Sequence, residues 1–159
     1  MIDFELVIKS LTTAKVDFVI IGEIASLMHG WKTAQMKLEF CYLRTSENLR
    51  KIVGVFATFN PRLRGFPEDL PFVWDERTLQ NGKNFTLKTA IGDIDLLDEV
   101  AGVGDFEAVK KESVVTILYD CEVRVLTLEG LIKAKRAAGR TKDLLVLPEL
   151  EALQELPRE

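Results

Sequence analysis

The sequence predicts an α/β protein, with a mixed sheet of about five strands flanked by helices and a helical lobe at the C-terminal end. The run 16–21 is apolar except for Asp17, which is typical of a strand covered on both faces. Two further segments, 37–43 and 93–97, alternate polar and apolar residues with the period of a strand. Between and after these strands, apolar residues recur at the spacing of amphipathic helices.

A chain of 159 residues is long enough for one domain with a substantial core. We expect a single domain over 1–159, with a sheet core at 1–126 and the helical lobe at 127–159. Hydrophobic residues make up 47% and charged residues 29%, as in soluble globular proteins. The net charge of −4 argues against an extensive nucleic-acid-binding surface.

The N-terminal segment and the cysteines indicate the compartment. The chain begins with the acidic segment MIDFEL, and no apolar run approaches the ~20 residues of a membrane span. We therefore expect a cytoplasmic protein without a membrane partner. Cys41 and Cys121 lie far apart in apolar runs, so two reduced, packed thiols are expected rather than a disulfide or a zinc site.

The N-terminal half is predicted to alternate helices and strands. Asp3 can cap a first helix, and a short helix at 24–29 would end at Gly30. The strand at 37–43 is followed by Thr45 or Ser46, either of which can cap a helix that runs to about Phe59.

The second half begins with an irregular segment, 60–82, which is rich in proline and glycine. Strands are predicted at 84–89, 93–97, 114–119 and 121–125, and a short helix at 106–111. Thr127 can cap a helix that ends before Gly139, and a last helix is predicted at 143–156. Pro148 fits that helix only at its start or at a kink.

Three polar features of the predicted sheet are candidates for a functional site. They are the turn at Gly22-Glu23, the face of one strand that carries Lys37 and Glu39, and the face of another that carries Asp93 and Asp95. Charged strand faces are usually solvent faces, so a surface pairing of Lys37 with Asp95 explains the same residues without any ligand.

Four segments of the sequence resemble the nucleotidyltransferase superfamily, which includes DNA polymerase beta, kanamycin nucleotidyltransferase, the minimal nucleotidyltransferases and the nucleotidyltransferase toxins. The segments are IIGEIASLMHG (20–30), LEF (38–40), IGDIDLL (91–97) and LIKAKRAAGRTKDLLVLPELEAL (131–153). The resemblance covers most of the chain, and the last segment is most similar to the small bacterial toxin-like branch. It implies the nucleotidyltransferase fold.

The resemblance also implies roles for individual residues. In the superfamily a glycine-rich turn holds the triphosphate, and an Asp-x-Asp pair with a third Asp holds two magnesium ions. The turn corresponds to Gly22 and Glu23 here, the pair to Lys37 and Glu39, and the third carboxylate to Asp95. By the same resemblance, Lys135, Arg140 and Lys142 would contact phosphate or RNA. A solvated helix face with ion pairs to Glu129 or Asp143 explains the basic residues equally well.

Three of these matches depart from the pattern of the superfamily. A protonated lysine at Lys37 cannot ligate magnesium, which takes oxygen ligands. Glu39 keeps a carboxylate but moves its oxygens by ~1 Å or more, and a displacement of that size costs ~100-fold in a positioned reaction. A glutamate at Glu23 places a negative side chain where backbone N–H groups should meet phosphate.

Two main functions therefore remain open. In the first, the chain is a nucleotide-binding or regulatory module with a degenerate metal site, a pseudoenzyme. In the second, it is an active magnesium-dependent transferase that moves NMP from an NTP to a hydroxyl of RNA, protein or a small molecule, as in a toxin of a toxin–antitoxin pair. Glu39 and Asp95 would then hold the metal. The partners open to it are an NTP, an RNA or protein acceptor, a cognate partner protein and a second copy of the chain. A purely structural role is the third possibility.

Overall fold

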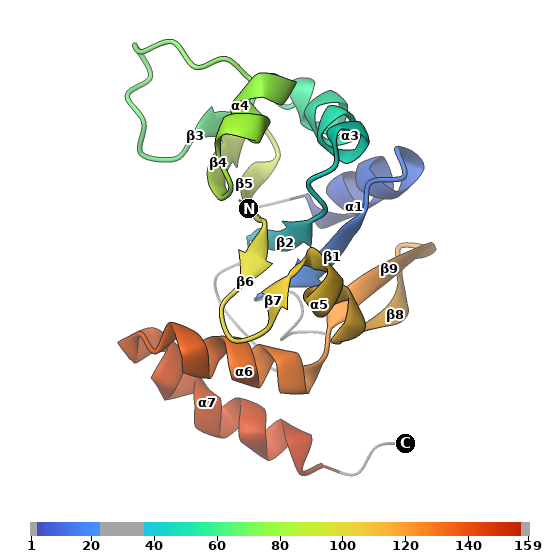
Figure 1. The fold of residues 1–159 in the computed structure, drawn as a ribbon, viewed down its shortest axis with the longest axis vertical. Helices are drawn as coiled ribbons and strands as arrows, with labels where there is room; N and C mark the ends of the chain where they lie inside the picture. Colours follow the sequence, from blue (N-terminus) through green and yellow to red (C-terminus); the bar gives the residue numbers. More distant parts are fainter. Residues whose placement is uncertain (1–2, 23–36, 157–159) are drawn as a thin grey trace.

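The computed structural model describes residues 3–22 and 37–156, which form a mixed sheet with helices around it (Figure 1). In chain order the elements are α1 (Phe4–Thr13), β1 (Phe18–Ile21), β2 (Leu38–Tyr42), α3 (Ser46–Ala57), β3 (Arg62–Leu63), α4 (Glu76–Asn81), β4 (Phe85–Thr89), β5 (Gly92–Leu97), β6 (Glu99–Val100), β7 (Gly104–Asp105), α5 (Phe106–Lys111), β8 (Ser113–Leu118), β9 (Cys121–Leu126), α6 (Leu128–Ala138) and α7 (Thr141–Gln154). The predicted α/β class is confirmed. The helix predicted at 24–29 lies outside the described residues.

The main sheet has seven strands in the order β3-β4-β5-β2-β1-β9-β8. Two of its pairings, β1 with β9 and β2 with β5, are parallel, and the others are antiparallel. The predicted mixed sheet is therefore confirmed, although it is larger than the five or so strands expected. A separate two-stranded sheet pairs β6 with β7.

The segment 60–82, predicted to be irregular, contains β3 and α4. A strand of two residues has no recognisable period, and β3 exists because it pairs with β4. The helix α4 had a local signal, because the Asp75 side chain accepts a hydrogen bond from Thr78 N at 2.8 Å and caps the first turn. The last helix also begins earlier than predicted, at Thr141, so Pro148 lies inside it.

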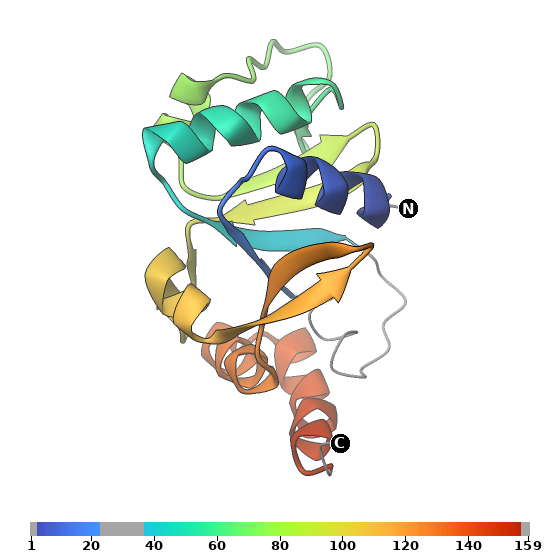
Figure 2. The same ribbon diagram turned by 90° about the vertical axis from the view of Figure 1, so that its right-hand side faces the viewer.

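The helices are divided between one face of the sheet and one end of the molecule. Helices α1 and α3 lie side by side over one face, and α6 and α7 lie together at the end of the long axis opposite the 64–74 segment (Figures 1 and 2). No helix in the described part of the chain is both long and apolar enough to cross a membrane.

A row of aromatic side chains crosses the interior between the sheet and α3. The ring of Phe40 lies 5.7 Å from Phe18 and 6.2 Å from Phe56, and Phe56 in turn meets Trp74 edge-on at 6.4 Å. Trp74 donates a hydrogen bond from Nε1 to Val53 O at 3.0 Å, so its polar atom is satisfied at the rim of the core. These contacts fasten the 64–74 segment to α3.

The two cysteines are free thiols, as the sequence predicted. Cys41 is fully buried in β2, and burial, aided by the charge of Asp98, raises the pKa of its thiol to about 12. Cys121 is half-buried, and its sulfur accepts a hydrogen bond from Thr12 Oγ1 at 3.3 Å. A neutral, enclosed Cys41 is a packing residue rather than a nucleophile.

The C-terminal helices contribute to two hydrophobic clusters. Leu131 of α6 belongs to the main core, whereas Ile132 packs with Leu147 and Leu150 of α7 in a smaller cluster. Gly139 ends α6 in the left-handed conformation, with φ 64°, and its N–H bonds to Lys135 O at 3.1 Å. The division of one domain into a core at 1–126 and a lobe at 127–159 stays a prediction.

One buried polar side chain, Asn48, connects three elements. It is 1% exposed and sits in the first turn of α3. Its Oδ1 accepts from Asp17 N at 2.7 Å, and its Nδ2 donates to Asp17 O at 3.1 Å and to Leu43 O at 2.7 Å. The amide thus binds the backbone before β1 and after β2, where Leu43 N also donates to Asp17 O at 3.3 Å.

We expect Asn48→Ala to lower the free energy of unfolding by about 2–4 kcal/mol, because it removes all three hydrogen bonds that this buried side chain makes. Urea denaturation would measure this, with the exposed Gln80→Ala as a control expected within about 0.5 kcal/mol of wild type. A loss at Asn48 no larger than that of the control would contradict this role.

Candidate functional site

A row of side chains crosses four adjoining strands on one face of the sheet. In the parallel pair of β2 and β5, Glu39 lies directly opposite Asp95, and in the antiparallel pair of β4 and β5, Thr86 lies opposite Asp95. Arg64, just after β3, bonds through its backbone N to Thr86 O at 2.8 Å and so extends the row. The register brings the predicted Glu39 and Asp95 together.

The carboxylate of Asp95 is held between two cations. Its Oδ2 lies 2.9 Å from Lys37 Nζ, and its Oδ1 lies 2.5 Å from Arg64 Nη2. The side chain of Asp95 is only 9% exposed, and those of Lys37 and Arg64 are about one-third exposed, at 30% and 31%. Lys37 also lies 3.6 Å from Glu39 Oε1. The pairing of Lys37 with Asp95 considered from the sequence is therefore present, and it is nearly buried.

Arg64 is the site residue that the sequence analysis missed. Its Nη2 also donates to Leu87 O at 3.2 Å, and its Nε lies 3.5 Å from Asp93 Oδ2. Asp93 therefore joins the same cluster, although its side chain is 46% exposed. The only local signal was the alternation Arg62-Leu63-Arg64, which places both arginines on one face of a short strand.

The surroundings of Lys37 keep its ammonium charged. Burial acts to lower the pKa of Lys37, but the hydrogen bond with Asp95 and the charge of Glu39 outweigh it, so the pKa is raised above its ordinary value. Lys37 is thus a fixed positive charge at neutral pH. By the resemblance described above, Lys37 corresponds to a position where the superfamily has a metal-binding carboxylate.

The residues present do not fit a magnesium ion. Magnesium takes six oxygen ligands in a near-octahedral arrangement, with one or two carboxylates and no cation among them. Here both oxygens of Asp95 are engaged by cations, and Glu39 has an ammonium 3.6 Å away. Over residues 3–22 and 37–156, no three His, Cys, Asp or Glu side chains converge in a metal-binding group.

The turn after β1 lies against the carboxylate of Glu39. Gly22 adopts φ +76°, and a Cβ built on it would lie 2.7 Å from Glu39 Cδ and 2.9 Å from either carboxylate oxygen. The positive φ favours glycine at this position, and a Cβ would also force the Glu39 carboxylate to move. Glu23, the neighbouring residue of the predicted phosphate-binding turn, lies outside the described residues.

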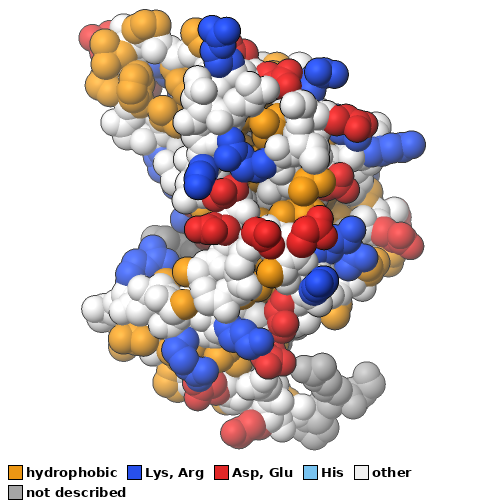
Figure 3. Space-filling view, in the orientation of Figure 1, with side chains coloured by type: hydrophobic (Ala, Val, Ile, Leu, Met, Phe, Trp, Pro, Cys, Tyr) orange, Lys and Arg blue, Asp and Glu red, His pale blue; other side chains and the backbone are white. Residues whose placement is uncertain are grey.

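A pocket of about 150 Å³ lies between this face and the C-terminal helices. Gly22 and Glu39 line its sheet side, and Lys135, Arg140 and Asp143 line its helix side. The outline of the molecule narrows at this level, between the sheet and α6 (Figure 3). The pocket thus brings together residues with different implied roles. The resemblance implied phosphate contact for Lys135 and Arg140 and metal binding for Glu39, which lies nearly 100 positions away in the sequence.

The helix side of the pocket is organised by Asp143, which is fully buried. Its Oδ2 accepts from Arg140 Nε at 2.6 Å and from Arg140 N at 3.2 Å, and its Oδ1 lies 3.4 Å from Lys135 Nζ. The carboxylate also sits in the first turn of α7, where the helix dipole favours a negative charge. Asp143 therefore fixes both cations at the pocket wall.

The ion pairs considered as the alternative are present, since Lys135 and Arg140 pair with Asp143 and two further basic residues pair at the surface. Lys133 lies 3.6 Å from Glu129 and 3.9 Å from Glu112, and Arg136 lies 2.9 Å from Glu151. Lys142 is exposed and does not line the pocket. Of the predicted phosphate contacts in the C-terminal helices, only Lys135 and Arg140 face the site.

Comparison with known proteins identifies the fold. The sequence matches no protein-family model, and no curated protein is significantly similar to it. Among solved structures, it resembles the lincosamide antibiotic adenylyltransferase LnuA in a lincomycin-bound crystal structure, with a TM-score of 0.60, 10% identity and coverage of 95% of this chain and 97% of that chain. It also resembles a candidate nucleotidyltransferase from Thermotoga maritima, with a TM-score of 0.55, 15% identity and 96% coverage of each chain.

The chain therefore has the nucleotidyltransferase fold over almost its whole length, as the sequence resemblance predicted. At 10% and 15% identity the likeness shows the fold alone. The function has to be argued from the residues of the site.

The pairing of Asp143 predicts a loss of stability in acid. Burial acts to raise the pKa of Asp143, but the hydrogen bonds from Arg140 and the charge of Lys135 outweigh it and lower the pKa below its ordinary value. The stability that the ionised Asp143 carboxylate contributes is fully present above the unfolded-state pKa of ~3.9. It is lost as the pH falls through the lower folded-state pKa.

We expect Asp143→Asn to cost about 1–3 kcal/mol of unfolding free energy at pH 7, and to lose less stability than wild type when the pH is lowered from ~5 to ~2.5. Thermal unfolding followed by circular dichroism would measure both, with the exposed Asp69→Asn as the matched control. Parallel pH profiles for wild type and Asp143→Asn would show that this ion pair does not stabilise the folded state.

Proposed function

We propose that the chain is a nucleotidyltransferase-fold protein with a degenerate metal site, which binds nucleotide without magnesium and acts as a nucleotide-binding or regulatory module. The observation that supports this most directly is the state of Asp95, whose two oxygens are engaged by Lys37 and Arg64. The carboxylate that corresponds to the third metal ligand is already neutralised by protein cations.

The electrostatics of the site favour this proposal over an active magnesium enzyme. Two unit charges ~4 Å apart at an effective dielectric of ~20 interact by ~4 kcal/mol, and a dication doubles the repulsion from Lys37 to about 8 kcal/mol. The ion would also have to displace Arg64 from Asp95. Removing one partner from such a nearly buried pair leaves a charge uncompensated, which adds to the cost.

The pocket keeps features that suit a nucleotide. Lys135 and Arg140 provide positive charge on one wall, while Ile21, Leu97 and Leu131 provide an apolar surface for a base or sugar. The Arg140 side chain is 60% exposed, so its guanidinium can meet a phosphate without leaving Asp143. Phosphate charge would then be met by protein cations instead of a metal ion.

Calorimetry with and without magnesium tests the proposal. We expect ATP or another NTP to bind with a Kd that changes less than about threefold between excess magnesium chloride and excess EDTA. Binding that requires magnesium would overturn the degenerate-site proposal in favour of an active transferase. The absence of binding for all four NTPs would overturn it in favour of a structural role.

Two substitutions in one helix locate the binding site in this assay. Lys135→Ala removes a cation from the pocket wall and is expected to weaken NTP binding about 10-fold, the loss of one charged contact. Lys133→Ala in the same helix removes a lysine that pairs with Glu112 and Glu129 away from the pocket, and should leave the Kd unchanged. Equal effects of the two substitutions would place the nucleotide elsewhere.

Restoring the superfamily pattern should create a metal site. We expect Glu23→Gly, Lys37→Asp and Glu39→Asp together to produce magnesium binding, because they replace the ammonium with a carboxylate and free the turn. Adding Arg64→Gln removes the other cation that contacts Asp95, so it should tighten magnesium binding further. Titration with Mn²⁺ as a paramagnetic probe would measure it. A folded triple variant without metal binding would show that this stretch does not correspond to the metal site of the superfamily.

A further inference from the structure

The two edges of the main sheet differ in how they are protected. One edge is β3, which has two residues, Arg62 and Leu63, and is followed by the cationic Arg64. The other edge is β8, Ser-Val-Val-Thr-Ile-Leu, which has six residues and contains no charge, proline or glycine. Natural edge strands usually carry such residues, or are short or covered, because an open edge pairs with another strand.

The side chains of β8 are unusually exposed for apolar residues. Val114, Val115 and Ile117 are 47%, 53% and 60% exposed, and Tyr119, just after the strand, is 41% exposed. Both faces of the strand are therefore open, since consecutive residues point to opposite faces. The hairpin of β8 and β9 projects from the body of the sheet, so its outer edge is accessible to another molecule (Figures 1 and 2).

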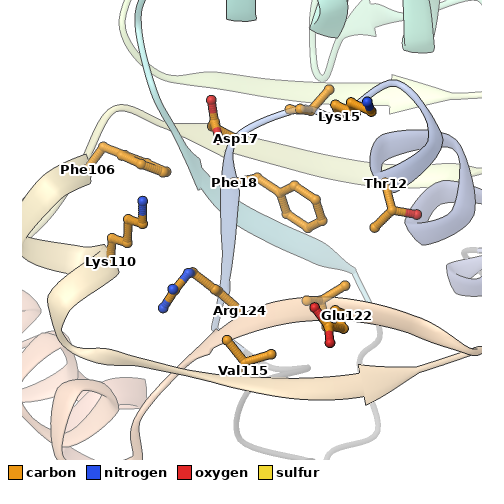
Figure 4. Close-up of a pocket in the computed structure, with 11 residues that line it drawn as sticks. Thr12, Lys15, Asp17, Phe18, Phe106, Lys110, Val115, Glu122 and Arg124 are labelled. Carbon is orange, nitrogen blue, oxygen red and sulfur yellow. The ribbon is translucent and has the colours of Figure 1, made fainter.

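One face of the hairpin also borders a pocket of about 320 Å³. Figure 4 shows Val115 and Arg124 on its hairpin side and Lys110 of α5 next to them. Val115 lines this pocket and is still 53% exposed. The exposed apolar surface of β8 is thus continuous with an open hollow rather than closed by a neighbouring helix.

We propose that β8 is a dimerisation edge, which pairs antiparallel with β8 of a second copy of this chain and joins the two sheets. An antiparallel pair of identical strands is related by a two-fold axis perpendicular to the sheet, so one residue lies opposite its own copy. The apolar strand is self-complementary in this arrangement, and the backbone groups left open at the edge become paired.

The charges at the two ends of β8 select the register. Lys110 and Lys111 precede the strand, and Asp120 follows it. With Val115 on the two-fold axis, Lys110 lies opposite Asp120 of the other copy, and the two valines form a cross-strand pair. With Thr116 on the axis, Glu112 would face Asp120, a like-charge contact. The Val115 register is therefore preferred, and its attractive pairs occur twice by symmetry.

Sedimentation velocity on the full chain tests the proposal. We expect a stable homodimer at protein concentrations of about 1–100 μM. In this range, wild type should sediment as a species with twice the 18.0 kDa mass of one chain. Ile117→Lys places a charge on the edge without touching the core, and should raise the dimer Kd at least 10-fold. Leu145→Lys, at a residue that is 72% exposed in α7, is the matched control and should leave the dimer intact.

Two further readouts distinguish this interface from any other. Lys110→Glu should weaken the dimer at low salt, because the glutamate would lie opposite Asp120 of the other copy, and Asp120→Asn added to it should restore most of the affinity by removing the new like charge. Asparagine suits the φ of 64° at this position. Backbone amides of 113–118 should exchange more slowly with deuterium at high protein concentration.

A wild-type chain that stays monomeric at 100 μM, or a dimer that Ile117→Lys does not weaken, would overturn the proposal. A monomer in pure solution would mean that any strand added to β8 comes from a different protein. Neither result depends on nucleotide binding, so the two proposals stand or fall separately.

Discussion

The carboxylate of Asp95 sets the main constraint on this structure, because a nearly buried charge costs several kcal/mol unless cations and hydrogen bonds compensate it. At 9% exposure it has little water, so its two oxygens need partners on the same face of the sheet. Lys37 approaches from β2 and Arg64 from beyond β4, two strands that flank β5. The strand order of the fold thus brings both cations to one carboxylate.

The same arrangement explains why the fold and its usual chemistry can be separated. In a two-metal site the buried carboxylates are compensated by magnesium, and the empty site carries an unfavourable concentration of negative charge. Here lysine and arginine provide that compensation permanently. The sheet therefore keeps its geometry without a metal, and Lys135 and Arg140 line the pocket beside it. In the proposed function, the means of activating a hydroxyl is lost, whereas the surface proposed to meet phosphate is retained.

Much of the fold could be predicted because its signals are local. The caps Asp3, Thr45 and Thr127 each accept the expected hydrogen bond, and the strand periods lie within about two residues of the observed strands. The role of Arg64 could not be predicted, since it depends on a two-residue strand that exists only through its pairing with β4. The convergence of Arg140 on the Gly22 turn likewise follows from tertiary packing of α7 and has no signature in either segment.

The coupling between Lys37 and Asp95 is the central interaction of the site, and a double-mutant cycle measures it most directly. The free energy of unfolding would be determined for wild type, Lys37→Met, Asp95→Asn and the double variant, in magnesium-free buffer at pH 7. We predict a coupling energy of about 1–3 kcal/mol, as for a pair in direct, partly buried contact. Changes that add to within about 0.5 kcal/mol would contradict the claim that a protein cation has replaced the metal at this carboxylate.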